Sequence, residues 1–250
     1  MNANPIRVES CRQSRPSFVE LDAHRATPVD LRCLWRELLT GSVRIIDHFY
    51  TEERCYLCLV PGKGTKRLRQ CFSPRNIEIL ERVLLGDSQK AVAFDFDLSP
   101  STVALAAARC LHALGLSCSA SGVPMLIVMA VHSLRTETPA LDARQSTVQH
   151  DGVSHAVVSA ARPDNRLSQV LPGSECAVTR LRVQGCTYAE IADIRRTSRR
   201  TVANQLSTAF RRLQVSGRVG LLNHLIGSLP CPPSYLDRPA GRVWDIRDAS

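Results

Sequence analysis

Arginines and hydrogen-bonding side chains are concentrated in the stretch SRRTVANQLSTAFRRL, residues 198–213. Apolar residues recur at every fourth position from Val202 to Phe210, which places them on one face of a helix. Arg200 and Asn204 then project from the opposite face. Asparagine and glutamine can form paired hydrogen bonds with adenine, arginine with guanine, and serine or threonine with phosphate. This helix is therefore predicted to have one face for packing and one face suited to a DNA duplex.

Two further helices are predicted ahead of this one. SECAVTRLRVQG ends at Gly185, and YAEIADIR begins after Thr187, a residue type that favours helix N-termini. Ser198 then caps the helix described above. Two helices joined by a short turn form a helix-turn-helix, whose second helix can lie in the DNA major groove. A fourth, amphipathic helix is predicted over RVGLLNHLIGSL, residues 218–229.

The stretch SPSTVALAAARCLHAL, residues 99–114, repeats the long helix 99 positions earlier. Ser, Thr, Val, Ala and the final Leu fall at matching places, so the framework that folds the helix is shared. The outward face of the earlier helix consists instead of Ser101, Ala104, Leu105, Ala108 and His112. The first copy (72–134) carries four Arg and Lys against five Asp and Glu, whereas residues 170–229 carry nine against three. The second copy (169–229) is thus predicted to bind DNA. The apolar first copy is predicted to pack against the helix-plus-hairpin module expected at residues 29–70, or against another subunit.

The second copy resembles the LuxR-type DNA-binding domain from Leu171 to Leu225 without gaps. The matching residues are Leu171, Glu175, Gly185, Glu190, Ile191, Ala192, Ser198, Thr201, Val202, Asn204, Leu206, Phe210, Leu213, Val215, Ser216 and Arg218. It departs from the usual family pattern at four positions. Gly173 stands where a proline is usual, Ala203 where a lysine is common, Gln205 where a histidine is common and Gln214 where a glycine is common. The first copy resembles the family more weakly, through its Ser-Pro-Arg opening, Gly86, Lys90, Ala93, Leu98, Ser99, Thr102, Val103, Leu114 and Gly115.

The resemblance implies double-stranded DNA as the partner. The residues expected to contact it are Thr187, Arg195, Arg196, Ser198, Arg199, Arg200, Thr201, Ala203, Asn204, Gln205, Ser207, Thr208, Arg211 and Arg212. It also implies a homodimer, or a heterodimer with another regulator, on two-fold related half-sites. Residues 218–229 are the expected dimer contact.

Composition and charge narrow the class of protein. The 250 residues carry a net charge of +9, which is compatible with a polyanionic partner. The first 30 residues contain no apolar block of the kind a secretory signal needs. The longest apolar run, Val123–Val131, has about half the length of a membrane-spanning helix. We therefore expect a soluble cytoplasmic protein with no membrane partner.

Metal, cofactor and catalytic signatures are weak in this sequence. Ten cysteines are present, but only Cys55 and Cys58 form a CxxC pair, and no second ligand pair completes a zinc site. The loop PGKGTKRLRQ, residues 61–70, lacks the spacing of a phosphate-binding Walker motif. The histidines are scattered without a partnering nucleophile or acid. We therefore expect reduced thiols, no metal, no cofactor and no enzymatic activity.

The predicted fold class is mainly α with a small β-hairpin or sheet and two four-helix LuxR-like helix-turn-helix units. A helix over 29–40 and strands over 43–50 and 54–60 are predicted before the first copy, and one strand over 153–160 after it. The expected divisions are a flexible arm (1–28), a helix-plus-hairpin module (29–70), the degenerate first copy (72–134), a linker with one strand (135–168), the DNA-binding second copy (169–229) and a flexible tail (230–250).

Three functions are compatible with these patterns. The first is a sequence-specific transcription regulator that acts through the second copy. The second is a protein-interaction factor, such as an anti-activator or heterodimer partner, that uses the apolar first copy without specific DNA binding. The third is a fragment similar to a sigma factor, which the lack of a second promoter-reading region weakens.

Overall fold

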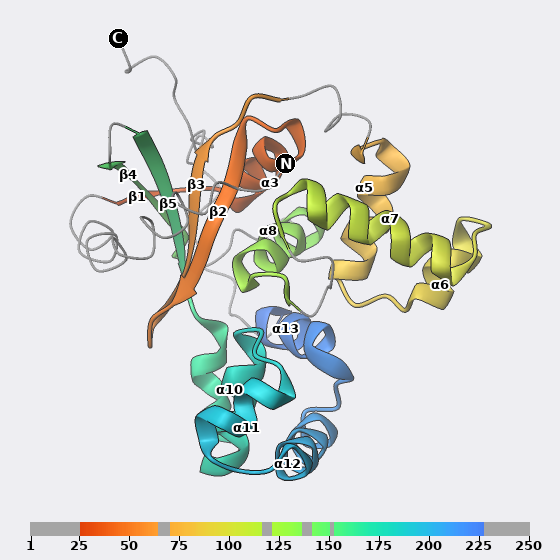
Figure 1. Cartoon of the computed structure of the whole chain (residues 1–250), viewed down its shortest axis with the longest axis vertical. Coiled ribbons are helices and arrows are strands. Elements are labelled where there is room, and N and C mark those ends of the chain that lie inside the picture. The colour runs from red at the N-terminus through yellow and green to blue at the C-terminus, as the bar shows by residue number, and fades with distance from the viewer. Residues whose placement is uncertain (1–25, 65–70, 117–121, 137–141, 151–152, 228–250) are drawn as a thin grey trace.

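A computed structural model describes residues 26–64, 71–116, 122–136, 142–150 and 153–227. Within them, one antiparallel sheet has the strand order β1-β4-β5-β3-β2. The strands are β1 (Thr27–Pro28), β2 (Val43–Tyr50), β3 (Arg54–Pro61), β4 (Arg144–His150) and β5 (Val153–Ala161). The hairpins β2–β3 and β4–β5 are local in the sequence, and pairing of β3 with β5 joins them across about 100 residues. Figure 1 shows this sheet beside the helices of the first copy.

The predicted fold class, mainly α with a small hairpin or sheet, is wrong. The five-stranded sheet is a full layer, and the fold is α+β. The error arises in the first part of the linker expected at 135–168. Residues 135–152 were expected to form a polar connector without a strand, but they contain β4. This strand, RQSTVQH, buries Ser146 in place of an apolar side chain, so it lacks the alternating apolar signal of a half-buried strand. The strand predicted at 153–160 is present as β5, but it lies in the interior of the sheet.

The two faces of the sheet bury different side chains. On β3, Cys55 and Leu57 belong to the main core beneath the helices, whereas Tyr56 and Cys58 belong to a second cluster on the opposite face. In that cluster Phe49 stacks on Tyr56 with 4.6 Å between ring centroids. Apolar residues on both faces are what an interior strand requires, which agrees with the central place of β3.

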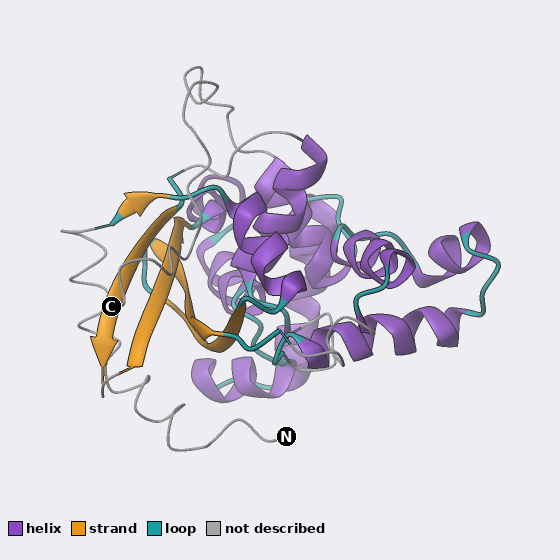
Figure 2. Ribbon diagram, turned by 90° about the horizontal axis from the view of Figure 1, so that it is seen from above, coloured by secondary structure: helices purple, strands orange, loops and turns teal. Residues whose placement is uncertain are grey.

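The first copy is inserted between the two hairpins. The helix α3 (Leu31–Thr40) precedes β2. After β3 come α5 (Pro74–Leu84), α6 (Gln89–Asp95), α7 (Pro100–Ala113) and α8 (Met125–Thr136). Serine side chains at positions 73, 88 and 99 cap α5, α6 and α7 by accepting hydrogen bonds from backbone N–H groups. Figure 2 shows the sheet as one layer with most of the helices gathered on one side.

The fourth helix of the first copy, α8, packs outside its own unit. Residues Met125 to Val131 are at most 1 % exposed, so this apolar helix is buried. Its neighbours include α3, β3 and α13 (Gly217–Gly227). Because α8 also contacts α5, it covers the sheet while remaining part of the first copy.

The second copy follows β5 through a short 3₁₀ turn, η2 (Pro163–Arg166), and the one-turn helix α9 (Leu167–Val170). Its remaining helices are α10 (Gly173–Val183), α11 (Tyr188–Arg195), α12 (Arg199–Arg212) and α13. The four helices predicted between residues 174 and 229 are thereby confirmed to within two residues at each described end. The helix predicted at 29–40 and the strands at 43–50 and 54–60 are also present.

Some predictions fall on residues outside the described ranges. Of the arm expected at residues 1–28, the structure describes residues 26–28, and Thr27–Pro28 form β1, which pairs with β4. The tail at 230–250 and residues 65–70 of the basic loop lie outside it. In the described ranges, no helix combines the length and the apolar character needed to cross a membrane.

Candidate nucleic-acid interface

The turn between α11 and α12 is held by backbone and side-chain caps. Arg196 ends α11 in the left-handed region at φ 50° and ψ 50°. The next amide, of Thr197, donates to the Ala192 carbonyl at 2.9 Å, which closes the helix end. Ser198 Oγ then accepts from the Thr201 amide at 3.0 Å and starts α12. These bonds fix the direction in which α12 leaves the turn.

A capping box fixes the start of α11. Thr187 Oγ1 accepts from the Glu190 amide at 3.3 Å, and Glu190 Oε2 accepts from the Thr187 amide at 2.7 Å. The hydrogen bonds from the Thr187 backbone and hydroxyl lower the pKa of the exposed Glu190 carboxyl. Thr187, one of the predicted DNA contacts, is therefore already engaged within the chain.

The buried face of α12 anchors the helix in a small core. Val202 and Leu206 are fully buried and cluster with Val178 of α10 and Ile191 of α11. Phe210 is half-buried and contacts both this cluster and the main core. The predicted packing side of the helix is thus confirmed, and the helix cannot rotate about its axis without exposing these side chains.

The opposite face of α12 is accessible, and Figure 1 places this helix at the end of the molecule away from α8. Among the predicted contacts, those with exposed side chains are Thr187, Arg195, Arg196, Ser198, Arg199, Arg200, Thr201, Asn204, Ser207, Arg211 and Arg212. Ala203, Gln205 and Thr208 are half-buried at the edges of this face. We call the exposed and half-buried set the α12 face.

The charges of the α12 face are mostly uncompensated. Within the described part of the chain, no ion pair involves Arg199, Arg200 or Arg211. Arg212 differs, because its Nε lies 3.6 Å from Glu175 Oε2 at the start of α10. The guanidinium groups nearest the turn and along the outer face therefore remain available for an anionic ligand.

The equivalent face of α7 in the first copy has a different chemistry. Leu105 occupies the place of Asn204 and is 51 % exposed. Ala104 and Ala108 flank it and are half-buried, and Phe94 at the end of α6 is 87 % exposed. This face offers mainly apolar surface, with Ser101 and His112 as its exposed polar side chains.

Sequence reasoning missed two exposed apolar residues on α11. Tyr188 is 41 % exposed and its ring lies 5.8 Å from the guanidinium carbon of Arg182. Ile194, at the other end of α11, is 58 % exposed. Tyr188 stands three and four residues before the buried Ile191 and Ala192, which is the spacing of a packing face, so no signal in the sequence marks it as exposed.

A buried arginine joins the second copy to the rest of the molecule. Arg218, at the start of α13, is 3 % exposed, and its Nη2 donates to the Val183 carbonyl at 2.8 Å. Its Nε donates to the Arg182 carbonyl at 3.1 Å, so it caps the C-terminal end of α10. Burial lowers the pKa of Arg218 to about 10, while the neighbouring Tyr50 hydroxyl of β2 acts in the opposite direction.

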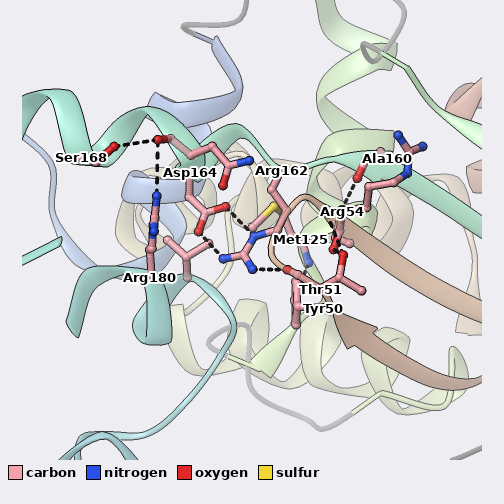
Figure 3. A network of polar contacts seen from close by, with 12 residues as sticks. Tyr50, Thr51, Arg54, Met125, Ala160, Arg162, Asp164, Ser168 and Arg180 are labelled. Atoms are coloured by element: carbon pink, nitrogen blue, oxygen red, sulfur yellow. Dashed lines mark hydrogen bonds and ion pairs between the residues drawn. The ribbon is translucent and has the colours of Figure 1, made fainter. Parts of the chain in front are cut away.

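A buried ion pair lies where β5 leads into η2 (Figure 3), close to the same Tyr50. Arg162 contacts Asp164 through two hydrogen bonds, Nε to Oδ1 at 2.9 Å and Nη2 to Oδ2 at 2.5 Å. Its Nη1 donates to the Thr51 carbonyl at 2.5 Å, and its guanidinium carbon lies 5.7 Å from the Tyr50 ring centroid. Burial alone would lower the pKa of Arg162, but the hydrogen bonds and charge of the Asp164 carboxylate have the larger combined effect and raise this pKa. This network fixes the path by which the chain enters the second copy.

The apolar side chains of α13 are covered within the chain itself. Leu221 and Leu222 are fully buried, and Leu225 and Ile226 are less than 9 % exposed, in the core that includes α8. The expectation that residues 218–229 form the dimer contact is therefore wrong for these side chains, because using them would require α13 to leave this core.

The cysteines form no metal centre in the described residues. No cluster of three or more His, Cys, Asp or Glu there could hold a metal ion. Cys55 and Cys58 belong to clusters on opposite faces of β3, so the CxxC pair does not converge. Burial raises the pKa of the Cys55 thiol to about 12, which keeps it protonated and unreactive.

Comparisons of the chain with models of protein families, with curated proteins and with solved structures found no match.

Proposed function

We propose that this protein is a sequence-specific transcription regulator that binds double-stranded DNA through the α12 face. The observation that carries the proposal is the two-sided character of α12, in which Val202 and Leu206 are buried while Arg200, Asn204 and Arg211 are exposed on the opposite side. A helix built in this way can enter a major groove as the second member of a helix-turn-helix. The resemblance of residues 171–225 to the LuxR-type domain supports the same assignment.

Each group on the α12 face has a distinct role in this proposal. Arg195, Arg196 and Arg199 surround the turn, where they neutralise phosphates and release counterions. Asn204 pairs with adenine and Arg200 with guanine, since these side chains make bidentate contacts with those base edges. The protein needs no cofactor or catalytic group for this activity, and it acts at the chromosome, in the cytoplasm.

The repeat supplies a matched test of this function. The variant Arg200→Ala/Asn204→Ala/Arg211→Ala removes the reading groups, and its control, Ser101→Ala/Leu105→Ala/His112→Ala, changes the equivalent exposed positions of the first copy. DNA selected from a random pool by the native chain serves as the probe in fluorescence anisotropy titrations. We expect the first variant to lose at least roughly a hundredfold in affinity, because each bidentate contact contributes about 1–3 kcal/mol. The control should stay within about twofold of the native chain.

Two results would contradict the proposal. If the native chain selects no sequence and shows no salt-sensitive binding, the α12 face does not read DNA. If both triple variants lose affinity equally, the face of the first copy is involved as well, which contradicts the assignment of DNA binding to the α12 face.

A second function is favoured by the exposed Phe94 and Leu105. These apolar residues suit a protein-interaction factor that pairs with another regulator through the first copy. In that case DNA selection fails with the native chain, and the triple substitution in the first copy abolishes binding to the partner protein.

A further inference from the structure

The helix α13 contacts the same structural position in both copies of the repeat. Within the second copy, Arg218 Nη2 donates to the carbonyl of Val183 at 2.8 Å. Across the copies, Asn223 Nδ2 donates to the carbonyl of Leu84 at 3.1 Å. Leu84 and Val183 are 99 residues apart and both end the first helix of their unit, α5 and α10. One helix of the second copy therefore caps the equivalent helix ends of both units.

The first copy has a matching surface for this contact. Gly86 follows the end of α5 at φ 94°, and Gly185 follows the end of α10 at φ 101°. A Cβ atom on Gly86 would lie 3.5 Å from Asn223 Nδ2 and 3.8 Å from Val219 Cγ1, so α13 runs directly over this turn.

The helix α13 also contacts α8, the fourth helix of the first copy. A Cβ atom on Gly227 would lie 3.8 Å from His132 Nε2 of α8. The fourth helices of the two copies thus pack on each other inside one chain (Figure 1). The side of α13 that points away from this core carries Gly217, Gly220 and His224, none of which has an apolar side chain.

We propose that the first copy takes the place of a second subunit, so that the chain binds DNA as a monomer at a single asymmetric half-site. This inference rests on the proposed function of the α12 face. The fourth-helix surface through which a dimer was expected is already covered by α8 and by the turn at Gly86. The internal partner reads no bases, because its outward face presents Leu105 in place of Asn204 and its charge is slightly negative.

The recovered DNA motif and the mass of the complex test this inference together. Sequences are selected with the full chain, and the complexes with the selected duplex are weighed by sedimentation velocity at protein concentrations above and below the dissociation constant. We expect one chain per duplex and a motif without a second, inverted half-site one helical turn, or about 10 base pairs, away. Two chains on a two-fold symmetric motif would overturn the inference and leave the proposed function intact. If no motif is selected, both the inference and the proposed function are contradicted.

The variant Gly220→Gln gives an independent readout on the outer side of α13. A Cβ atom at this position would lie 3.9 Å from both Ser216 Oγ and Val215 Cβ, so the new side chain fits without strain. If α13 faces solvent, Gly220→Gln should bind the selected duplex within about twofold of the native affinity and with the same mass. If a second chain docks on α13, the variant should lose tenfold or more in affinity together with any two-chain species, which would overturn the inference.

Discussion

Position 204 carries an exposed asparagine, and the equivalent position of the first copy, 105, carries a leucine that is 51 % exposed. Arg200 corresponds to Ser101, which carries no charge. Val202 and its equivalent Val103 show no such divergence, and both are fully buried. At the scale of single residues, the side chains that fold the helix are therefore kept apart from the side chains that bind a ligand.

Asp164 is the residue whose loss should destabilise the molecule most directly. Its side chain is 0 % exposed and paired with Arg162, which is 5 % exposed. The substitution Asp164→Asn removes the negative charge and leaves a buried arginine unpaired, so the free energy of unfolding should fall by about 3–5 kcal/mol. Urea denaturation followed by circular dichroism measures this change.

The partly exposed pair of Arg82 and Asp87 provides the control for that substitution. Because solvent screens this pair, Asp87→Asn should cost about 0–1 kcal/mol. An equal effect of Asp87→Asn and Asp164→Asn would show that the pair between β5 and η2 contributes no more than a surface contact.

At the scale of the elements, the helices could be predicted because their ends are marked locally. Ser198 precedes α12, Thr187 precedes α11, and glycine follows α3 at position 41 in the left-handed region. The burial of one side of α12 also followed from its apolar spacing. The candidate α12 face was therefore predictable from residues that are neighbours in the sequence.

The sheet could not be predicted in the same way, because its decisive contacts are long-range. β4 buries Ser146 and carries polar side chains on both sides, so its pattern does not distinguish a strand from a linker. The pairing of Leu57 with Val158 joins segments about 100 residues apart, and no local pattern encodes it. The covering of α13 by α8 likewise depends on how the two copies meet, which their separate sequences do not specify.

The N-caps of α7 and α12 allow folding and DNA binding to be separated. Ser99 Oγ accepts from the Thr102 amide at 3.1 Å, and Ser198 Oγ accepts from the Thr201 amide at 3.0 Å. Either Ser99→Ala or Ser198→Ala should lower the free energy of unfolding by about 1 kcal/mol, because each leaves one amide without its partner. Only Ser198→Ala should weaken binding to the selected duplex in anisotropy titrations. Equal weakening by Ser99→Ala would contradict the assignment of DNA binding to α12.

At the scale of the whole molecule, one core connects segments that the sequence suggests are separate units. The main apolar cluster runs from Val29 before α3 to Ile226 in α13 and includes the buried side of the sheet. The junction is also polar, since Arg218 and Arg162 lie beside Tyr50 of β2, whose pKa burial raises to about 12. A molecule joined in this way is expected to unfold as one unit.

Substitution of Leu222 tests this cooperativity from one end of the chain to the other. Leu222 of α13 is fully buried, and Leu222→Ala should lower the free energy of unfolding by about 2–5 kcal/mol through the cavity it leaves. In a Trp244→Phe background, fluorescence reports on Trp35 of α3, which is 1 % exposed in the other half of the chain. If the core is shared, the Trp35 transition shifts to lower urea by the same amount as the circular dichroism signal. A Trp35 midpoint that stays in place while circular dichroism shows an earlier step would mean that the second copy unfolds alone, and α13 would then be free to leave α8.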